Sequence, residues 1–125
     1  MSEARVQKIL YVEDDPDYRE AVRAMLESAG YQVIEAASAE EGLAAFHAHN
    51  PDAALVDLMM EEVDAGLTLV RDFKAAGSAM PVLVLSSVGD ALAMERATAD
   101  LGVAAVLQKP IQRDTLAGIL RSHLG

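Results

Sequence analysis

The chain has 125 residues, 52% of them hydrophobic and only four of them proline, which fits one compact domain and excludes a disordered chain. Its net charge of -10 opposes direct contact with nucleic acid or anionic lipid, and it indicates proteins or cations as partners. Cysteine is absent, so disulfides and thiolate metal sites are excluded, and the apolar runs are too short to span a membrane. We therefore expect a single cytoplasmic domain.

Short apolar runs alternate with helix-like segments along the whole chain. In chain order, the pattern predicts a strand over 8–12, a helix over 17–29, a strand over 31–36, a helix over 38–49, a strand over 53–56, a helix over 67–76, a strand over 82–85, a helix over 90–101, a strand over 104–107 and a helix over 113–124. Gly30, Gly77 and Gly102 follow three of these helices as stop signals. Ser38 and Glu41 form a capping-box pattern at the start of another.

This alternation indicates an α/β fold, because parallel strands need crossover connections and helices supply them. Five strand-helix units are too few to close an eight-stranded barrel. We therefore predict a flavodoxin-like, three-layer (βα)5 sandwich, with a five-stranded parallel sheet in the order 2-1-3-4-5.

Polar residues gather where four of the predicted strands end. They are Glu13, Asp14 and Asp15 after the first strand, Asp57 after the third, Ser86 and Ser87 after the fourth, and Lys109, which precedes Pro110, after the fifth. Each has an ordinary explanation by itself, such as an acid that complements a helix dipole. In a parallel sheet, however, these strand ends share one edge, next to the switch point between strands 1 and 3. Their coincidence there indicates a ligand site.

The chemistry of this set favours a phosphoryl group and a metal ion. Two carboxylates about 5 Å apart repel by roughly 3 kcal/mol, so several together must take up protons or a cation. Mg²⁺ prefers oxygen ligands and commonly keeps positions for water and phosphate oxygens. A lysine and a hydroxyl would stabilise the charge of phosphoryl transfer to a carboxylate.

Four stretches resemble the response-regulator receiver domains of two-component signalling, the CheY-like family. They are ILYVEDDPDYREAVRAML (9–26), NPDAALVDLMM (50–60), MPVLVLSSVGD (80–90) and LQKPI (107–111), in the family's order and near its spacing. The resemblance covers essentially the whole chain. It implies a signalling switch rather than an enzyme, formed by one receiver domain over residues 1–125. Because the chain ends one helix after Lys109, we expect no output domain.

The resemblance implies that Asp57 is the phospho-acceptor. It also implies that Glu13, Asp14 and Asp57 bind Mg²⁺ together with the backbone carbonyl of Met59. Asp14 is implied as the more direct ligand of the acidic pair.

Other matched positions are implied to serve the phosphoryl group. Ser86 matches the family's hydroxyl and switch residue, with Ser87 as an alternative, and Lys109 matches the lysine that contacts the phosphoryl group. The bond before Pro110 is implied to be cis. Met59 and Val88 match two positions that influence how fast water reaches the phosphoryl group. Both residues are apolar, so the resemblance implies slow dephosphorylation.

The same resemblance implies the partners. A sensor histidine kinase or a phosphotransfer protein would phosphorylate Asp57. Phosphorylation would alter the surface of the predicted helix over 90–101, strand over 104–107 and helix over 113–124, and an unknown downstream protein would bind that surface. We expect no direct contact with nucleic acid or with a membrane.

Two departures from the family pattern keep an alternative open. Glu61 replaces the usual proline, and Gly66 lies nine residues after Asp57, so this loop is one residue longer. Val106 replaces the aromatic switch residue. The alternative is a degenerate receiver, which would act as a phosphorylation-independent interaction module. An enzyme on a related sheet is a third hypothesis, but Glu13-Asp14-Asp15 lacks the Asp-x-Asp spacing of a haloacid-dehalogenase-type phosphatase, and these acids would repel the phosphate of a flavodoxin-type loop.

Overall fold

Five parallel strands form one sheet in this computed structural model, which describes residues 6–58, 60, 65–86 and 101–124. The sheet order is β2-β1-β3-β4-β5, as predicted. The strands are β1 (Lys8–Val12), β2 (Gln32–Ala36), β3 (Ala53–Asp57), β4 (Val82–Ser86) and β5 (Ala105–Gln108).

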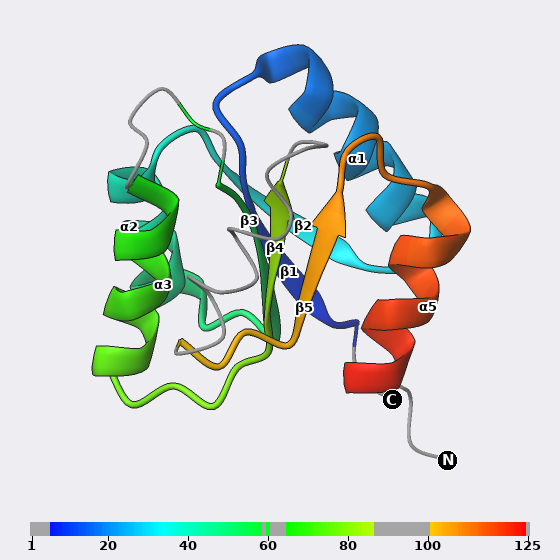
Figure 1. Cartoon of the computed structure of the whole chain (residues 1–125). Coiled ribbons are helices and arrows are strands. Elements are labelled where there is room, and N and C mark those ends of the chain that lie inside the picture. Colours follow the sequence, from blue (N-terminus) through cyan, green and yellow to red (C-terminus); the bar gives the residue numbers. More distant parts are fainter. Residues whose placement is uncertain (1–5, 59, 61–64, 87–100, 125) are drawn as a thin grey trace.

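Helices cover both faces of the sheet, which gives the predicted three layers (Figure 1). One face carries α1 (Pro16–Ser28) and α5 (Arg113–Leu124), and the other carries α2 (Ala39–His49) and α3 (Ala65–Ala75). The helix predicted over 90–101 falls outside the described residues except for Leu101, which lies in a turn. No helix in the described part of the chain is long and apolar enough to cross a membrane.

The two central strands β3 and β4 are buried along their whole length. Their side chains alternate between the two layers of helices, as the pleat of a strand requires. Leu55, Leu83 and Leu85 join the cluster with α1 and α5, whereas Val56, Val82 and Val84 join the cluster with α2 and α3. Each fully buried side chain of this size contributes about 1.5–3 kcal/mol of transfer free energy. These strands therefore fix the position of the residues at their ends.

Several element boundaries differ from the prediction by one or two residues. Helix α1 begins at Pro16, because the Asp15 side chain accepts hydrogen bonds from the first free amides and proline suits the first helical position. Strand β5 runs one residue later than predicted. The helix predicted over 67–76 begins two residues earlier, at Ala65, and ends at Ala75. The stop predicted at Gly30 is confirmed by its left-handed backbone (φ 98°).

Gly66 brings the start of α3 against the end of β3. A Cβ atom at this position would lie 2.9 Å from Leu58 Cδ2 and 3.0 Å from the backbone oxygen of Asp57. Only a residue without a side chain permits this approach, so Gly66 sets how closely α3 can pack beside Asp57.

We expect Gly66→Ala to lower the free energy of unfolding by about 1–3 kcal/mol, because the added methyl group must displace backbone atoms. Gly118→Ala in α5 is the matched control: nothing lies within 4 Å of its Cβ position, so it should be neutral or stabilise by up to about 1 kcal/mol. Urea denaturation measures both. Equal stabilities for the two variants would contradict the close approach.

Candidate functional site

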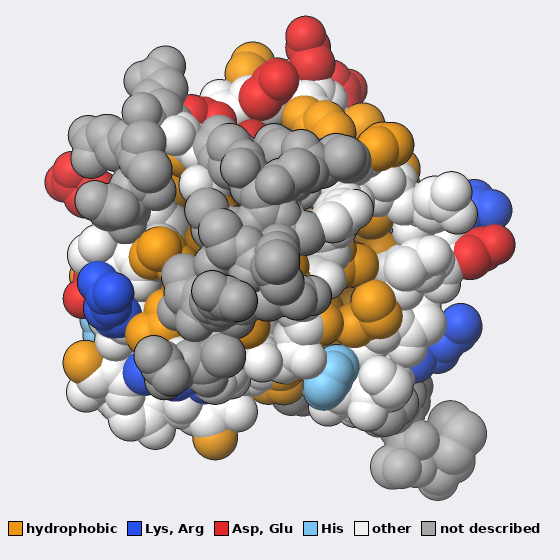
Figure 2. Space-filling view, viewed as in Figure 1, with side chains coloured by type: hydrophobic (Ala, Val, Ile, Leu, Met, Phe, Trp, Pro, Cys, Tyr) orange, Lys and Arg blue, Asp and Glu red, His pale blue; other side chains and the backbone are white. Residues whose placement is uncertain are grey.

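Five of the polar residues singled out in the sequence lie at one edge of the sheet, as predicted. Asp57 and Ser86 are the last residues of β3 and β4, and Lys109 follows β5. Glu13 and Asp14 follow β1 directly. At this end of the molecule Figure 2 shows acidic side chains gathered near the start of α1.

Three carboxylates converge at this edge. One oxygen from each of Glu13, Asp14 and Asp57 lies within 4.8 Å of the other two. Asp57 is fully buried and Glu13 is 1% exposed, whereas Asp14 is partly exposed. At an effective dielectric constant near 20, two carboxylates at this distance repel by about 3 kcal/mol. The cluster is therefore held by the fold against its own repulsion.

Lys109 supplies the compensating charge. Its Nζ donates to Asp57 Oδ2 at 2.9 Å and to Glu13 Oε1 at 3.2 Å. Burial alone would lower the pKa of Lys109, but the hydrogen bonds and charges of Asp57 and Glu13 outweigh burial and raise it. Lys109 is thus a permanent cation between the two buried acids.

Glu13 is held from several directions. Its Oε1 accepts from the Tyr11 hydroxyl at 3.3 Å, and its Oε2 accepts from the Asp15 backbone N–H at 3.2 Å. Burial, followed by the hydrogen bond and the charge of Asp57, raises the pKa of Glu13 to about 7. Burial and the same acids hold the pKa of Tyr11 well above its ordinary range, so its phenol remains a donor.

Ser86 contributes a hydroxyl at the end of β4. The residue is fully buried, and its Oγ has no hydrogen-bond partner within the described ranges. Its backbone oxygen accepts from the Lys109 N–H at 2.9 Å, which ties the ends of β4 and β5 together. A buried hydroxyl without a partner costs about 1–3 kcal/mol. A ligand with acceptor oxygens at this edge would recover that cost.

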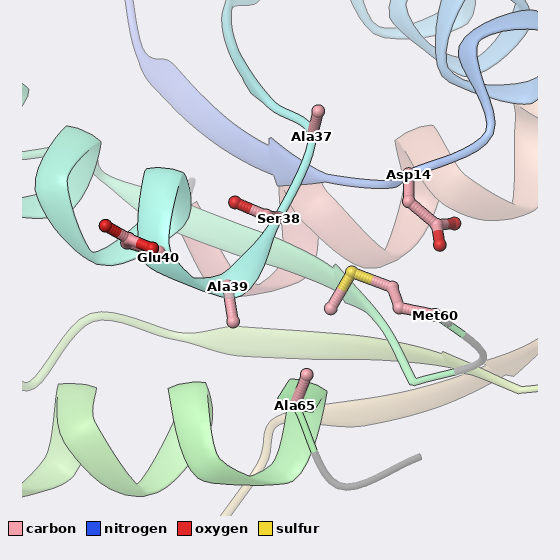
Figure 3. A pocket seen from close by; sticks show the side chains of 7 residues that line it. All are labelled: Asp14, Ala37, Ser38, Ala39, Glu40, Met60 and Ala65. Atoms are coloured by element: carbon pink, nitrogen blue, oxygen red, sulfur yellow. The ribbon is translucent and has the colours of Figure 1, made fainter. Parts of the chain in front are cut away.

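A pocket of about 240 Å³ opens beside the acids (Figure 3). Its lining residues are Asp14, Ala37, Ser38, Ala39, Glu40, Met60 and Ala65. The Asp14 carboxylate faces the side of the pocket where Met60 lies. Asp14 is therefore the member of the cluster that solvent and ions can reach from this side.

The carboxylate set is compatible with a metal ion. Three oxygen donors lie close enough to share one cation, and two of the three residues are buried. Hard divalent cations prefer such oxygen ligands. When Glu13 is ionised, three carboxylates and one ammonium leave two negative charges, which one divalent cation balances.

Some predicted features lie elsewhere or outside the described residues. Met59, Glu61, Ser87 and Val88 are outside them, so the predicted carbonyl ligand and the alternative hydroxyl stay predictions. The Lys109–Pro110 bond is cis, as predicted. Val106, on β5, pairs with Val84 and packs against the core on the α2 and α3 side.

Sequence reasoning missed the residues that support the acids. Arg19 Nη1 donates to the Glu13 backbone oxygen at 2.8 Å, and Tyr11 donates to the Glu13 carboxylate. Asp15 caps α1 instead of joining the carboxylate cluster. The pair Asp15-Pro16 could have revealed the cap of α1, because aspartate followed by proline is typical of a helix start. The tyrosines fit an apolar pattern, which gave no sign of their hydroxyl contacts.

The raised pKa of Glu13 gives a pH-dependent stability. Between its ordinary pKa of 4.5 and about 7, the folded protein binds more protons at this position than the unfolded chain. The contribution of Glu13 is therefore complete below pH 4.5 and is lost as the pH rises through 7. Without divalent cations, we expect the unfolding free energy of the wild type to fall across this window relative to Glu13→Gln. Urea titrations in a chelator measure the difference, and a difference that does not change with pH would contradict the assignment.

Solved receiver structures share this fold. The chain matches the chemotaxis protein CheY4 of Vibrio cholerae with a TM-score of 0.87 and 27% identity, covering 96% of this chain and 100% of that chain. It matches a response regulator receiver domain protein from Clostridium thermocellum with a TM-score of 0.87 and 26% identity, covering 95% and 94% of the two chains.

Curated relatives are response regulators. The chain is 34% identical over 117 residues to the response regulator MprA of Mycolicibacterium vanbaalenii, covering 94% of this chain and 50% of that protein. It is 34% identical over 108 residues to the transcriptional regulatory protein GlrR of Escherichia coli, covering 86% of this chain and 24% of that protein. The chain thus spans half the length of these relatives or less. The family model of the response regulator receiver domain matches residues 9–121, and the chain belongs to this family of two-component signalling domains.

Proposed function

We propose that this receiver domain is a phosphorylation-activated switch that accepts a phosphoryl group on Asp57 with the help of Mg²⁺. The observation that carries the proposal is the convergence of a buried Asp57 with two further acids and a lysine at the carboxyl edge of the sheet. The donor would be a sensor histidine kinase or a phosphotransfer protein in the cytoplasm. The domain then acts as a signalling partner and promotes only its own phosphorylation and slow dephosphorylation.

Asp57 is suited to be the acceptor because β3 fixes it and Lys109 orients it. A carboxylate oxygen of Asp57 forms a bond to phosphorus while the bond from phosphorus to the donor's imidazole nitrogen breaks. The imidazole keeps that electron pair and takes up a proton. Lys109 remains cationic and contacts the phosphoryl oxygens, and the Ser86 hydroxyl, which has no partner among the described residues, donates to another.

Glu13, Asp14 and Asp57 would hold Mg²⁺, with the Met59 carbonyl as the fourth protein ligand. When bound, Mg²⁺ supplies Lewis-acid neutralisation of the charge on the phosphoryl oxygens. Asp14, which is partly exposed, would be the most direct ligand of Mg²⁺, and the buried Glu13 would support it. Release of the Glu13 proton on metal binding follows from its raised pKa.

Phosphorylation would change the surface that a downstream protein reads. In this proposal, the surface includes β5 and α5, together with the predicted helix over 90–101, of which residues 90–100 lie outside the described residues. Ser86 and Val106 are the proposed switch positions. A valine has no ring to swing, so the response would come from loop and packing changes on β5 rather than from an aromatic flip.

We expect the wild type, incubated with Mg²⁺ and acetyl phosphate, to gain the mass of one phosphoryl group. The proposed acceptor Asp57 and the carboxylates that would bind Mg²⁺ are both present in it. Asp57→Asn should gain none. Asp114→Asn is the matched control, since its side chain is 99% exposed on α5, and it should behave as the wild type. Intact-protein mass spectrometry measures the gain. A wild type without any gain would favour the phosphorylation-independent interaction module instead.

Mg²⁺ should also stabilise the folded domain. At a free concentration one hundred times its dissociation constant, a cation bound only by the folded state adds about 2.7 kcal/mol to the unfolding free energy. Thermal melts with and without Mg²⁺ should show this gain in the wild type and in Asp17→Asn, an exposed acid outside the cluster. Asp14→Asn should lose most of it. An equal gain in Asp14→Asn would place the cation elsewhere.

A further inference from the structure

The Tyr18 side chain contacts both Lys109 and the backbone that follows it. Lys109 Nζ lies 4.3 Å from the centroid of the Tyr18 ring. The Tyr18 hydroxyl accepts a hydrogen bond from the Ile111 N–H at 3.3 Å. One side chain thus contacts the charged end of the lysine and holds the chain two residues beyond it.

Helix α1 fixes the position of this tyrosine. Tyr18 lies in the first turn, and its backbone N–H donates to the capping oxygen Asp15 Oδ1 at 3.3 Å. The ring is half-buried against the cluster formed with α1 and α5. The same Asp15 donates its own N–H to Glu13. The start of α1 therefore positions Glu13 and the ring beneath Lys109 together.

Lys109 needs such a support because its stem is long and flexible and its head makes only point-charge contacts. The face of a tyrosine ring attracts an ammonium group, and the attraction grows when water is partly excluded. Lys109 is only 22% exposed here. The ring's attraction does not depend on the charge of Asp57, so it persists when an acyl phosphate replaces the carboxylate and the original ion pair is lost.

We propose that Tyr18 is a positioning residue that holds Lys109 Nζ at Asp57 before and during phosphoryl transfer. This proposal rests on the proposed function, in which Lys109 contacts the phosphoryl group. Tyr18 itself touches neither the phosphoryl group nor the metal in this scheme. It acts through the lysine, so its effect must disappear when the lysine is absent.

The test compares Tyr18→Leu, which removes the ring, with Tyr18→Phe, which keeps it. Tyr31→Leu is the matched control, because Tyr31 packs half-buried against the same cluster without contacting the lysine. Each is made in the wild type and in Lys109→Met. The initial rate of phosphorylation by acetyl phosphate with Mg²⁺ is measured by intact mass. The NMR chemical shift of Lys109 Cε, the carbon bonded to Nζ, reports whether the Tyr18 ring lies beside the ammonium group. This measurement needs no phosphorylation.

We expect Tyr18→Leu to slow phosphorylation by about three- to tenfold, the equivalent of one cation–π contact. Tyr18→Phe should stay near the wild-type rate and retain the ring-current shift of Lys109, which Tyr18→Leu should lose. In Lys109→Met, Tyr18→Leu should have no further effect on the residual rate.

Four outcomes would overturn the proposal. If Tyr18→Leu matches the wild-type rate, or if Tyr31→Leu slows the reaction equally, Tyr18 has only a packing role and the proposed function stands. If Tyr18→Leu slows Lys109→Met as well, the effect does not pass through the lysine. If the wild type gains no phosphoryl group, the proposed function fails, and with it the positioning role, even where the ring-current shift persists.

Discussion

The arrangement of this site depends on Lys109, which forms ion pairs with both Asp57 and Glu13. Buried acids this close would repel each other or take up protons, and an isolated buried charge is costly to the fold. The lysine reduces both costs while leaving the carboxylate oxygens close together. The site is thus neither a neutral core nor a solvated acidic patch. It is a charged cluster at the edge of the sheet, and it is compatible with a metal ion.

The sheet supplies this cluster because parallel strands deliver their last residues to one edge. The covering helices keep β3 and β4 rigid, and Gly66 lets α3 approach the end of β3. The start of α1 then fixes Glu13 through the Asp15 N–H and Lys109 through the Tyr18 ring. Stability and function meet here, since the buried Ser86 hydroxyl has no partner among the described residues, a cost that a ligand with acceptor oxygens would remove.

The main features of the fold and the site edge could be predicted from sequence. Apolar runs of strand length between helical patterns predicted the five strands, and the rules for parallel sheets led to the order 2-1-3-4-5. The strand ends then located Asp57 and Lys109. The start of α3 was missed because Gly66 is a poor helix former and its role is tertiary packing. The contacts of Tyr11 and Tyr18 were missed for a similar reason: periodicity assigns a residue to a face, but it does not tell which polar group the hydroxyl or the ring contacts.

A stable analogue of the phosphoryl group can test whether Asp57, the cation and Lys109 form one binding site. Beryllofluoride can add to a carboxylate without a phosphodonor, so fluorine NMR of the protein with beryllofluoride reports the acceptor, the cation and the lysine together. If Asp57 is the acceptor, we expect bound fluorine resonances that require Mg²⁺, disappear in Asp57→Asn and weaken in Lys109→Ala. Resonances that persist in Asp57→Asn, or their absence from the wild type with Mg²⁺, would contradict it.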